Sequence, residues 1–412
     1  MTAELTELDR ATATRRSDPH ASPQAPRSGV SPARRLVEVG VRVVIAAVVW
    51  FFLADVFWGD VVHYASVTLP VSLHHLPYRD FLWEFPPLSL VPAIGSHVAG
   101  PAYTLVFTAT MIALEYGSLE VLRRAFPQRA GAVARWWHVA VLPLAAFTWF
   151  RLDFLSVIFA TAGLVALVKV RPAGRWAVLG FAAKLWPAVL VVGLVVQRRL
   201  RSAWLAVAGC AAVVALWWAW APHGLGTFLE YRKGGGIQVE STIGAVRLLL
   251  GAHPSVVSGA WVVGDGGWAW VDPAGMALVA TAVVAIVLWS RRRVLDPVRV
   301  CGFLTVMLLV TSRILSPQYL VWVAPFAVLL AADGDRRVGI LFTASAWLTF
   351  AVLVDYDAFL LGNRALALLA VARNVVLVVL GVSMLVGVRV RSGRAAPGEA
   401  GSGPVDLAEA GL

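Results

Sequence analysis

An aspartate, Asp60, directly follows an apolar run that contains the sequence FFLADVFWG. The end of a membrane helix would hold its carboxylate at the membrane surface, where it could act as a general base on a hydroxyl group. The simpler alternative is that Asp60 only marks the end of the span. A second candidate, Arg313, lies in an apolar run with no acidic residue close to it in the sequence. Its guanidinium therefore needs an anionic partner, and a phosphate group suits it.

Other polar residues gather near the ends of predicted helices, and all of them fall on the same predicted side of the membrane. Arg151 and Asp153 stand at a tight turn, where a local ion pair between them is an equally simple explanation. The remaining candidates are His63, Arg79, Asp80, Glu84, Arg232, Gln238, Glu240, Gln318 and Tyr319. Polar groups from distant segments at one face are typical of a substrate site built from loops over a helical scaffold.

The sequence predicts neither a metal site nor a cofactor. His74 and His75 are adjacent, so their side chains would point apart on any regular element, and no Cys/His spacing accompanies them. Cys210 and Cys301 both fall in predicted membrane spans, so we expect no disulfide framework.

The elements that carry these residues are predicted to be membrane helices. Of the 412 residues, 59% are hydrophobic and 14% are charged, and the mean hydropathy is +0.75. About 20 apolar residues cover the ~30 Å hydrocarbon core of a bilayer, and the chain contains many such runs. We therefore predict an all-α polytopic membrane protein. The net charge of +11 reflects arginines at the ends of these runs and does not indicate nucleic-acid binding.

The arginines also predict the topology, because positive residues stay on the cytoplasmic side. They fall on one side if both termini are cytoplasmic, which gives about ten crossings of the plasma membrane. The run at 176–196 breaks the alternation, since arginines flank both of its ends and Gly180, Lys184 and Pro187 interrupt it. We interpret it as a hairpin that enters and leaves on the cytoplasmic side, which gives about twelve helices and puts Lys184 in that leaflet.

This topology divides the chain into one membrane domain and two tails. The domain covers 34–390, and the disordered cytoplasmic tails cover 1–33 and 391–412. Two long segments, 59–101 and 222–273, are expected outside the membrane on its outer face. They contain most of the polar candidates, so we expect the site to face outwards.

Several segments together resemble the family 87 polytopic glycosyltransferases, which have a GT-C-type fold. The resemblance spans roughly residues 35–388, and the most specific pair of motifs is PYRDF..EFPPL with SPQYLVW. In chain order the segments are GDVVHY, LPYRDFLWEFPPL, RLD, AAKLWPAVL, GGGIQVESTIGAVRLLLG and SRILSPQYLVWVAPF. Members of this family use polyprenyl-phosphate mannose, and related enzymes use polyprenyl-phosphate arabinofuranose.

The resemblance implies an inverting transfer from a polyprenyl-phosphate sugar to a cell-envelope glycolipid or glycan. Asp60 matches the position of the family's catalytic carboxylate. Arg313 is the first choice for stabilising the leaving phosphate, and Arg151 or Arg232 is the second. Side chains expected to hold sugar hydroxyls are Asp80, Glu84, Gln238 and Gln318.

Other functions remain open at this point. A transporter or lipid flippase would be expected to show internal repeats and polar residues near the midplane, neither of which the sequence contains. A lipid-linked glycan polymerase or ligase would use a similar outer site, and a membrane scaffold without chemistry would keep only the fold. Besides its sugar substrates, the protein is expected to contact only membrane lipid.

Overall fold

The described residues fold almost entirely as helices. The computed structural model describes residues 31–52, 59–72, 74–231, 236–257, 259–264 and 266–387. The chain forms two compact units, Met1–Gly40 and Val41–Leu412. The first includes the beginning of helix α2 (Pro32–Phe52), where Arg34 Nε lies 3.3 Å from Glu38 Oε1. The second contains the remaining helices and all of the described strands.

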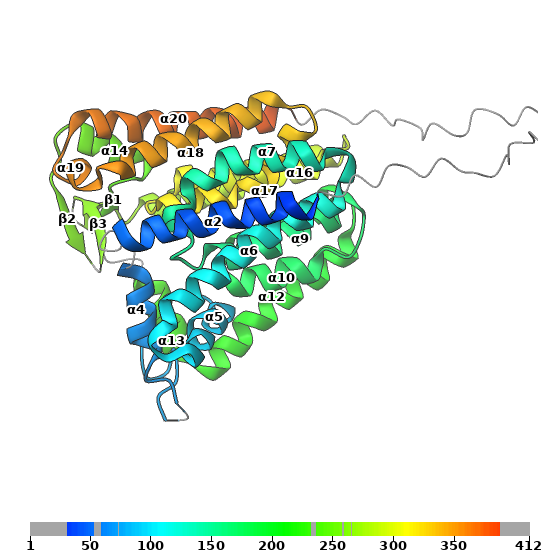
Figure 1. Ribbon diagram of the computed structural model, residues 1–412. Helices are drawn as coiled ribbons and strands as arrows, with labels where there is room; N and C mark the ends of the chain where they lie inside the picture. The colour runs from blue at the N-terminus through cyan, green and yellow to red at the C-terminus, as the bar shows by residue number, and fades with distance from the viewer. Residues whose placement is uncertain are drawn as a thin grey trace, which may run out of the picture. The chain divides into compact units, whose positions relative to one another are not determined.

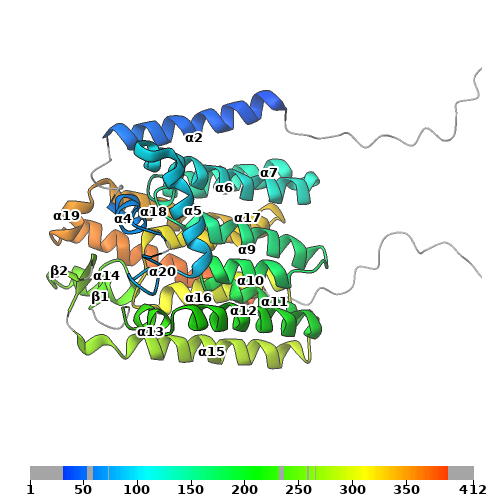
Figure 2. The same ribbon diagram turned by 90° about the horizontal axis from the view of Figure 1, so that it is seen from below.

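Most of the described helices of the second unit lie side by side in a bundle (Figures 1 and 2). They are α6 (Tyr103–Ala125), α7 (Ala130–Val141), α9 (Asp153–Val168), α10 (Gly174–Ala183), α11 (Val189–Val196), α12 (Leu200–Trp220), α15 (Val271–Ser290), α16 (Pro297–Thr311), α17 (Ala324–Ala332), α18 (Arg336–Val354) and α20 (Arg364–Val386). In the described chain, 5 helical segments are long and apolar enough to cross a membrane, namely Pro87–Ala125, α12, α15, α18 and α20. The protein is therefore a mostly helical polytopic membrane protein, which confirms the predicted fold class.

Shorter elements lie at one end of the bundle, on the left in both views. This end carries α4 (Gly59–Thr68), α14 (Thr242–Leu249), α19 (Tyr356–Leu360) and the strands β1 (Ile237–Gln238), β2 (Pro254–Val257) and β3 (Ala260–Val263). The other short helices are α5 (Leu90–Gly95), α8 (Ala145–Thr148) and α13 (Pro222–Tyr231).

The three strands form a small antiparallel sheet in the order β1-β3-β2, within the segment that we had expected to be a loop. Ile237 faces Val263 across β1 and β3, and both side chains are fully buried. They pack in a second hydrophobic core with Leu248 of α14, Phe359 of α19 and Ala367 of α20. The same core contains residues of α15 and α18, so it fixes the sheet to the ends of three bundle helices.

The segment 174–196 is a hairpin, as the sequence predicted. Helix α10 ends at Ala183, Lys184 is extended, and the chain returns through a 3₁₀ turn (η5, Trp186–Ala188) into α11. The two ends of the hairpin are close, because Arg199 Nη2 donates a hydrogen bond of 2.7 Å to the carbonyl of Arg171. A helix of 10 residues rises only about 15 Å, roughly half of the hydrocarbon core, so neither leg crosses a membrane alone.

Lys184 lies at the tip of the hairpin, and arginines connect helix ends at the opposite, open end. Arg198 donates to the carbonyl of Arg291, and Arg299 Nη2 lies 2.6 Å from Asp335 Oδ2. Arg129 pairs with Asp333 in the same manner. The grouping of these arginines agrees with the predicted topology, in which they share one membrane face.

A buried ion pair joins α2 to α6 in the second unit. Arg42 and Glu115 are both fully buried, and Arg42 Nη2 donates to Glu115 Oε1 at 2.6 Å. Trp137 of α7 donates its indole N–H to the same oxygen at 2.5 Å. Charges among apolar helices are costly unless they are paired and hydrogen-bonded, and this cluster satisfies both conditions.

Candidate functional site

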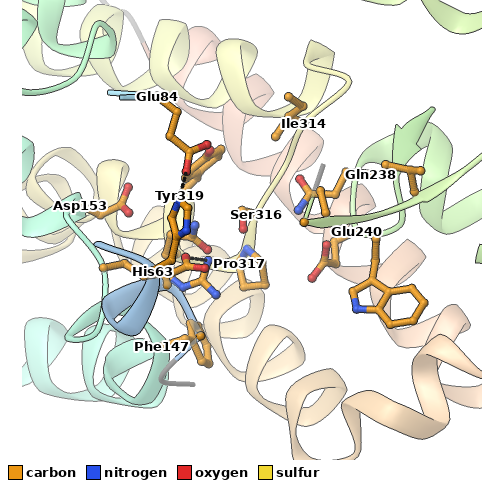
Figure 3. Close-up of a pocket in the computed structure, with 18 of the residues that line it drawn as sticks. His63, Glu84, Phe147, Asp153, Gln238, Glu240, Ile314, Ser316, Pro317 and Tyr319 are labelled. Atoms are coloured by element: carbon orange, nitrogen blue, oxygen red, sulfur yellow. Dashed lines mark ion pairs between the residues drawn. The ribbon is translucent and has the colours of Figure 1, made fainter. Parts of the chain in front are cut away.

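A cavity of about 750 Å³ lies at the end of the bundle that carries the sheet. Its walls come from α4, the loop at Glu84, the start of α9, the tip of the hairpin, the sheet and the segment before α17. In Figure 3, His63 and Asp153 lie on one side of the cavity and Gln238 and Glu240 on the other, with Pro317 between them. The site is therefore assembled from segments that are distant in the sequence, as expected.

Asp60 lies in the first turn of α4 and lines this cavity. Its Oδ2 is 2.7 Å from Nη1 of Arg151, which stands just before α9. The side chains are 38% and 23% exposed, so both groups remain open to a ligand. Burial lowers the pKa of Arg151, but the negative charges around it, first that of Asp60, outweigh burial and raise the pKa overall. Arg151 is thus a permanent cation.

Tyr64, one helical turn after Asp60, lines the same wall and is almost fully buried. Burial, followed by the negative charge of Asp60, raises its pKa well above the ordinary value. Its ring packs edge-on against Phe85 and Trp83. Tyr64 therefore remains a neutral phenol beside Asp60.

Asp153 does not pair with Arg151, which corrects the local ion pair considered above. Its Oδ1 is 2.7 Å from Lys184 Nζ and accepts a hydrogen bond of 2.6 Å from the indole of Trp322. The Lys184 ammonium also lies 4.4 Å from the ring centre of Tyr319, which favours a cation–π contact. The side chains of Asp153 and Lys184 are only 2% and 9% exposed.

The predicted topology puts Lys184 in the leaflet opposite Asp60, and the structure corrects this relation. The hairpin brings Lys184 into the cavity that Asp60 and Arg151 also line. The interruption of the apolar run predicted the hairpin but not its depth, because the legs of a re-entrant hairpin can end anywhere between the two faces.

Arg313 also lines the cavity, but it is already paired. Its Nε lies 3.1 Å from Oδ2 of Asp272 in the first turn of α15, and its backbone N–H donates to Oδ1 of the same residue at 3.1 Å. The Arg313 side chain is 2% exposed. The argument that its charge needs a phosphate partner was therefore wrong, because Asp272 neutralises it from a distant part of the sequence.

Only part of the motif PYRDFLWEFPP lines the cavity. Glu84 and Phe85 line the cavity, and Glu84 Oε1 lies 3.9 Å from His63 Nε2. Arg79 and Asp80 are not among the residues that line the cavity. Asp80 Oδ2 instead accepts a hydrogen bond of 2.7 Å from the backbone N–H of Leu76 and so stabilises the turn. The structure thus gives no support to a sugar-binding role for Asp80.

Three residues of the cavity carry acceptor groups that have no partner among the described residues. Gln238, Glu240 and Gln318 line the cavity, and each has one buried side-chain oxygen without a hydrogen bond, namely Oε1, Oε2 and Oε1. Tyr319 lines the cavity beside Gln318. The last predicted residue, Arg232, lies outside the described residues.

The model of glycosyltransferase family 87 matches residues 81–312, more than half of the chain. The chain belongs to glycosyltransferase family 87. It is therefore a membrane glycosyltransferase, as the sequence motifs implied. Comparisons with curated proteins and with solved structures found no match. The matched range includes the residues that line the cavity from Glu84 to Glu240, whereas Asp60 and Arg313 lie outside it.

Sequence reasoning missed part of this glycosyltransferase site. Trp322 and Tyr356 contact the charged residues of the cavity, but an aromatic residue in an apolar run gives no signal of such a role. Lys184 could have been found, because it is one of only three lysines and interrupts an apolar run. Among the described residues, no group of three His, Cys, Asp or Glu side chains is arranged to hold a metal ion.

Proposed function

We propose that this glycosyltransferase moves a sugar, first of all mannose, from a polyprenyl-phosphate donor to a hydroxyl of a cell-envelope glycolipid or glycan. The observation that supports it best is the contact between Asp60 and Arg151 in the cavity, which places a carboxylate beside a cation. The carboxylate suits the attacking hydroxyl, and the cation suits the phosphate that leaves.

In the proposed reaction, the oxygen of the acceptor hydroxyl attacks the anomeric carbon of the donor sugar. A carbon–oxygen bond forms to the acceptor while the bond from the anomeric carbon to the phosphate oxygen breaks, with inversion. Asp60 takes the proton of the hydroxyl, and the polyprenyl phosphate leaves with the electron pair of the broken bond. General-base assistance of this kind contributes about 10²–10⁴-fold to a rate.

Arg151 is the best candidate for stabilising the leaving phosphate. It uses Nη1 for Asp60, and its Nε has no partner among the described residues, so part of its donor fork can bind another anion. Lys184, which also lines the cavity, is the second candidate for binding the phosphate, because its ammonium group carries three donors. Arg313 ranks below both because its Nε and its backbone N–H already bind Asp272.

A lipid-linked donor fits the proposed orientation of the cavity towards the outer face. Nucleotide sugars are made in the cytoplasm and do not reach that face. A polyprenyl-linked sugar can enter from within the bilayer, which makes it the more suitable donor for a site at the end of a membrane bundle.

A transfer assay with the purified protein in lipid nanodiscs tests this proposal. A panel of polyprenyl-phosphate sugars is offered with phosphoinositide and glycan acceptors, and the products are identified by mass spectrometry. We expect transfer from polyprenyl-phosphate mannose, and a loss of about 10²-fold or more in Asp60→Asn. The matched control is Asp80→Asn, a carboxylate outside the cavity wall, which should retain activity. Movement of lipid or solute without transfer from any donor would favour a transporter instead.

A further inference from the structure

We infer that Glu240 binds a hydroxyl group of a sugar substrate through Oε2, and that Tyr356, Arg373 and Asn374 position it for this purpose. Glu240 lines the cavity, yet the residue is only 2% exposed. Its Oε2 has no hydrogen-bond partner among the described residues. This inference rests on the proposed function, because it names a substrate contact in the same cavity.

The side chain of Glu240 is held by one of its two oxygens. The hydroxyl of Tyr356, at the start of α19, donates to Oε1 at 2.7 Å. The other oxygen is therefore fixed in direction but has nothing to bind. A buried polar atom without a partner is costly, and proteins retain such atoms where a ligand satisfies them.

The backbone of Glu240 is held from a different direction by α20. Arg373 Nη2 donates to the Glu240 carbonyl oxygen, and Asn374 Nδ2 donates to the same oxygen at 3.2 Å. Asn374 also donates to the carbonyl of Ser241 at 3.3 Å. Arg373 and Asn374 are almost fully buried. If their donors moved away from the turn, these buried hydrogen bonds to the carbonyls would be lost.

The turn that carries Glu240 is rigid on its other side as well. Ser241 Oγ accepts a hydrogen bond of 3.1 Å from the backbone N–H of Gly244 and so caps α14. A Cβ atom at Gly244 would collide with the carbonyl oxygen of Gln238, which shows how closely α14 approaches the strand. Glu240 is thus fixed through both its side chain and its backbone.

The ligand chemistry follows from the neighbouring acceptors. Gln238 and Gln318 line the same cavity, and each has a buried side-chain oxygen without a partner among the described residues. Several free acceptors in one cavity suit a ligand that carries several hydroxyl donors, as a sugar does. The donor sugar and the acceptor sugar share this chemistry, so the test must separate them.

The test is a binding cycle that combines Glu240→Gln with deoxy sugars, measured on the full chain in nanodiscs. The probes are a short-chain polyprenyl-phosphate mannose and n-octyl α-mannoside, each with its set of monodeoxy analogues. We expect Glu240→Gln to weaken binding of one probe by about 10-fold or more, since the amide lacks the second oxygen that accepts the hydrogen bond from the sugar hydroxyl. The analogue that lacks the recognised hydroxyl should bind wild type equally weakly and lose nothing further in Glu240→Gln. The probe that shows this coupling identifies the sugar.

Two controls keep the inference separate from folding and from catalysis. Glu120→Gln removes a buried glutamate that pairs with Arg123 away from the cavity, and it should leave both affinities unchanged. Tyr356→Phe should reproduce a smaller loss with the same hydroxyl dependence, whereas Tyr103→Phe should not. If Glu240→Gln does not fold, Tyr356→Phe replaces it in the binding cycle.

Additive losses for every analogue, wild-type affinity in Glu240→Gln, or no binding of either probe by wild type would overturn the inference. Absence of transfer in the separate assay counts only against the proposed reaction.

Discussion

The guanidinium of Arg151 lies 2.7 Å from the carboxylate of Asp60, although α6 and α7 separate the two residues in the sequence. The contact joins the proposed general base to the proposed phosphate-binding cation. Each charge orients the other when no ligand is bound, so substitution of one should change the behaviour of the other.

Arg151→Gln should lower kcat by about 10²–10³-fold, because a preorganised cation near the developing phosphate charge is lost. Arg151→Lys should lose less, since it keeps the charge but not the fork. The measurement is single-turnover transfer, with the exposed Arg79→Gln as the matched control. In the double variant Asp60→Asn/Arg151→Gln the two losses should not add, because residues in contact are coupled. Wild-type kcat in Arg151→Gln would exclude this role.

Lys184→Gln should destabilise the protein by about 3–5 kcal/mol, because it leaves the buried Asp153 carboxylate without its cation. Thermal unfolding in nanodiscs measures the change. The double variant Asp153→Asn/Lys184→Gln should recover most of the stability but not the activity. Lys169→Gln is the matched control, since Lys169 lies over the ring of Phe126 and not in the cavity. Full activity in the stable double variant would contradict a role for Lys184 in binding phosphate.

The stability should depend on pH through Glu240. Burial raises the pKa of its carboxyl, although the hydrogen bond from Tyr356 and the positive charge of Arg373 oppose the change. Because the folded-state pKa lies above the unfolded value of about 4.3, the neutral form is favoured by folding. Its contribution to the free energy of unfolding is full below that unfolded pKa and is lost as the pH rises through the folded pKa.

Unfolding midpoints of wild type and Glu240→Gln, measured over a pH series, test this dependence. The wild type should lose stability with rising pH relative to Glu240→Gln, whose amide does not titrate. Parallel curves for wild type and Glu240→Gln would show that this carboxyl does not titrate differently on folding.

The proposed orientation can be tested with two exposed arginines. Cys210 and Cys301 are first replaced by alanine, and Arg79→Cys or Arg292→Cys is then introduced. A membrane-impermeant maleimide added to intact cells should label position 79 and not position 292, which should react only after permeabilisation. The reverse pattern would invert the topology.

The sequence predicted the features that depend on local composition. Apolar length predicted the membrane helices, and the interruption at Gly180 and Pro187 predicted the hairpin. Gly180 is needed there because a Cβ atom would lie 2.6 Å from Pro187 Cβ. The structure places Asp60 on the wall of the cavity, and its role as a general base stays a prediction.

The sequence could not predict which charges pair. Asp272 binds Arg313 and Asp153 binds Lys184 across long separations, and only tertiary packing brings these residues together. The small sheet was not predicted for a different reason. Its strands have two to four residues, too few for an alternating pattern to be visible. The strands are held in place by packing on the second hydrophobic core, which only the folded chain forms.

Arg151, Lys184 and Arg313, which line the cavity, each have a carboxylate partner within 3.1 Å, namely Asp60, Asp153 and Asp272. In the proposed reaction, an incoming phosphate therefore finds no unneutralised charge in this set, and it competes with a carboxylate for the charge of the same cation. Binding of the phosphate to Arg151 would then loosen the hold of Arg151 on Asp60, the proposed base. In this view, the donor itself frees the proton acceptor that the transfer needs.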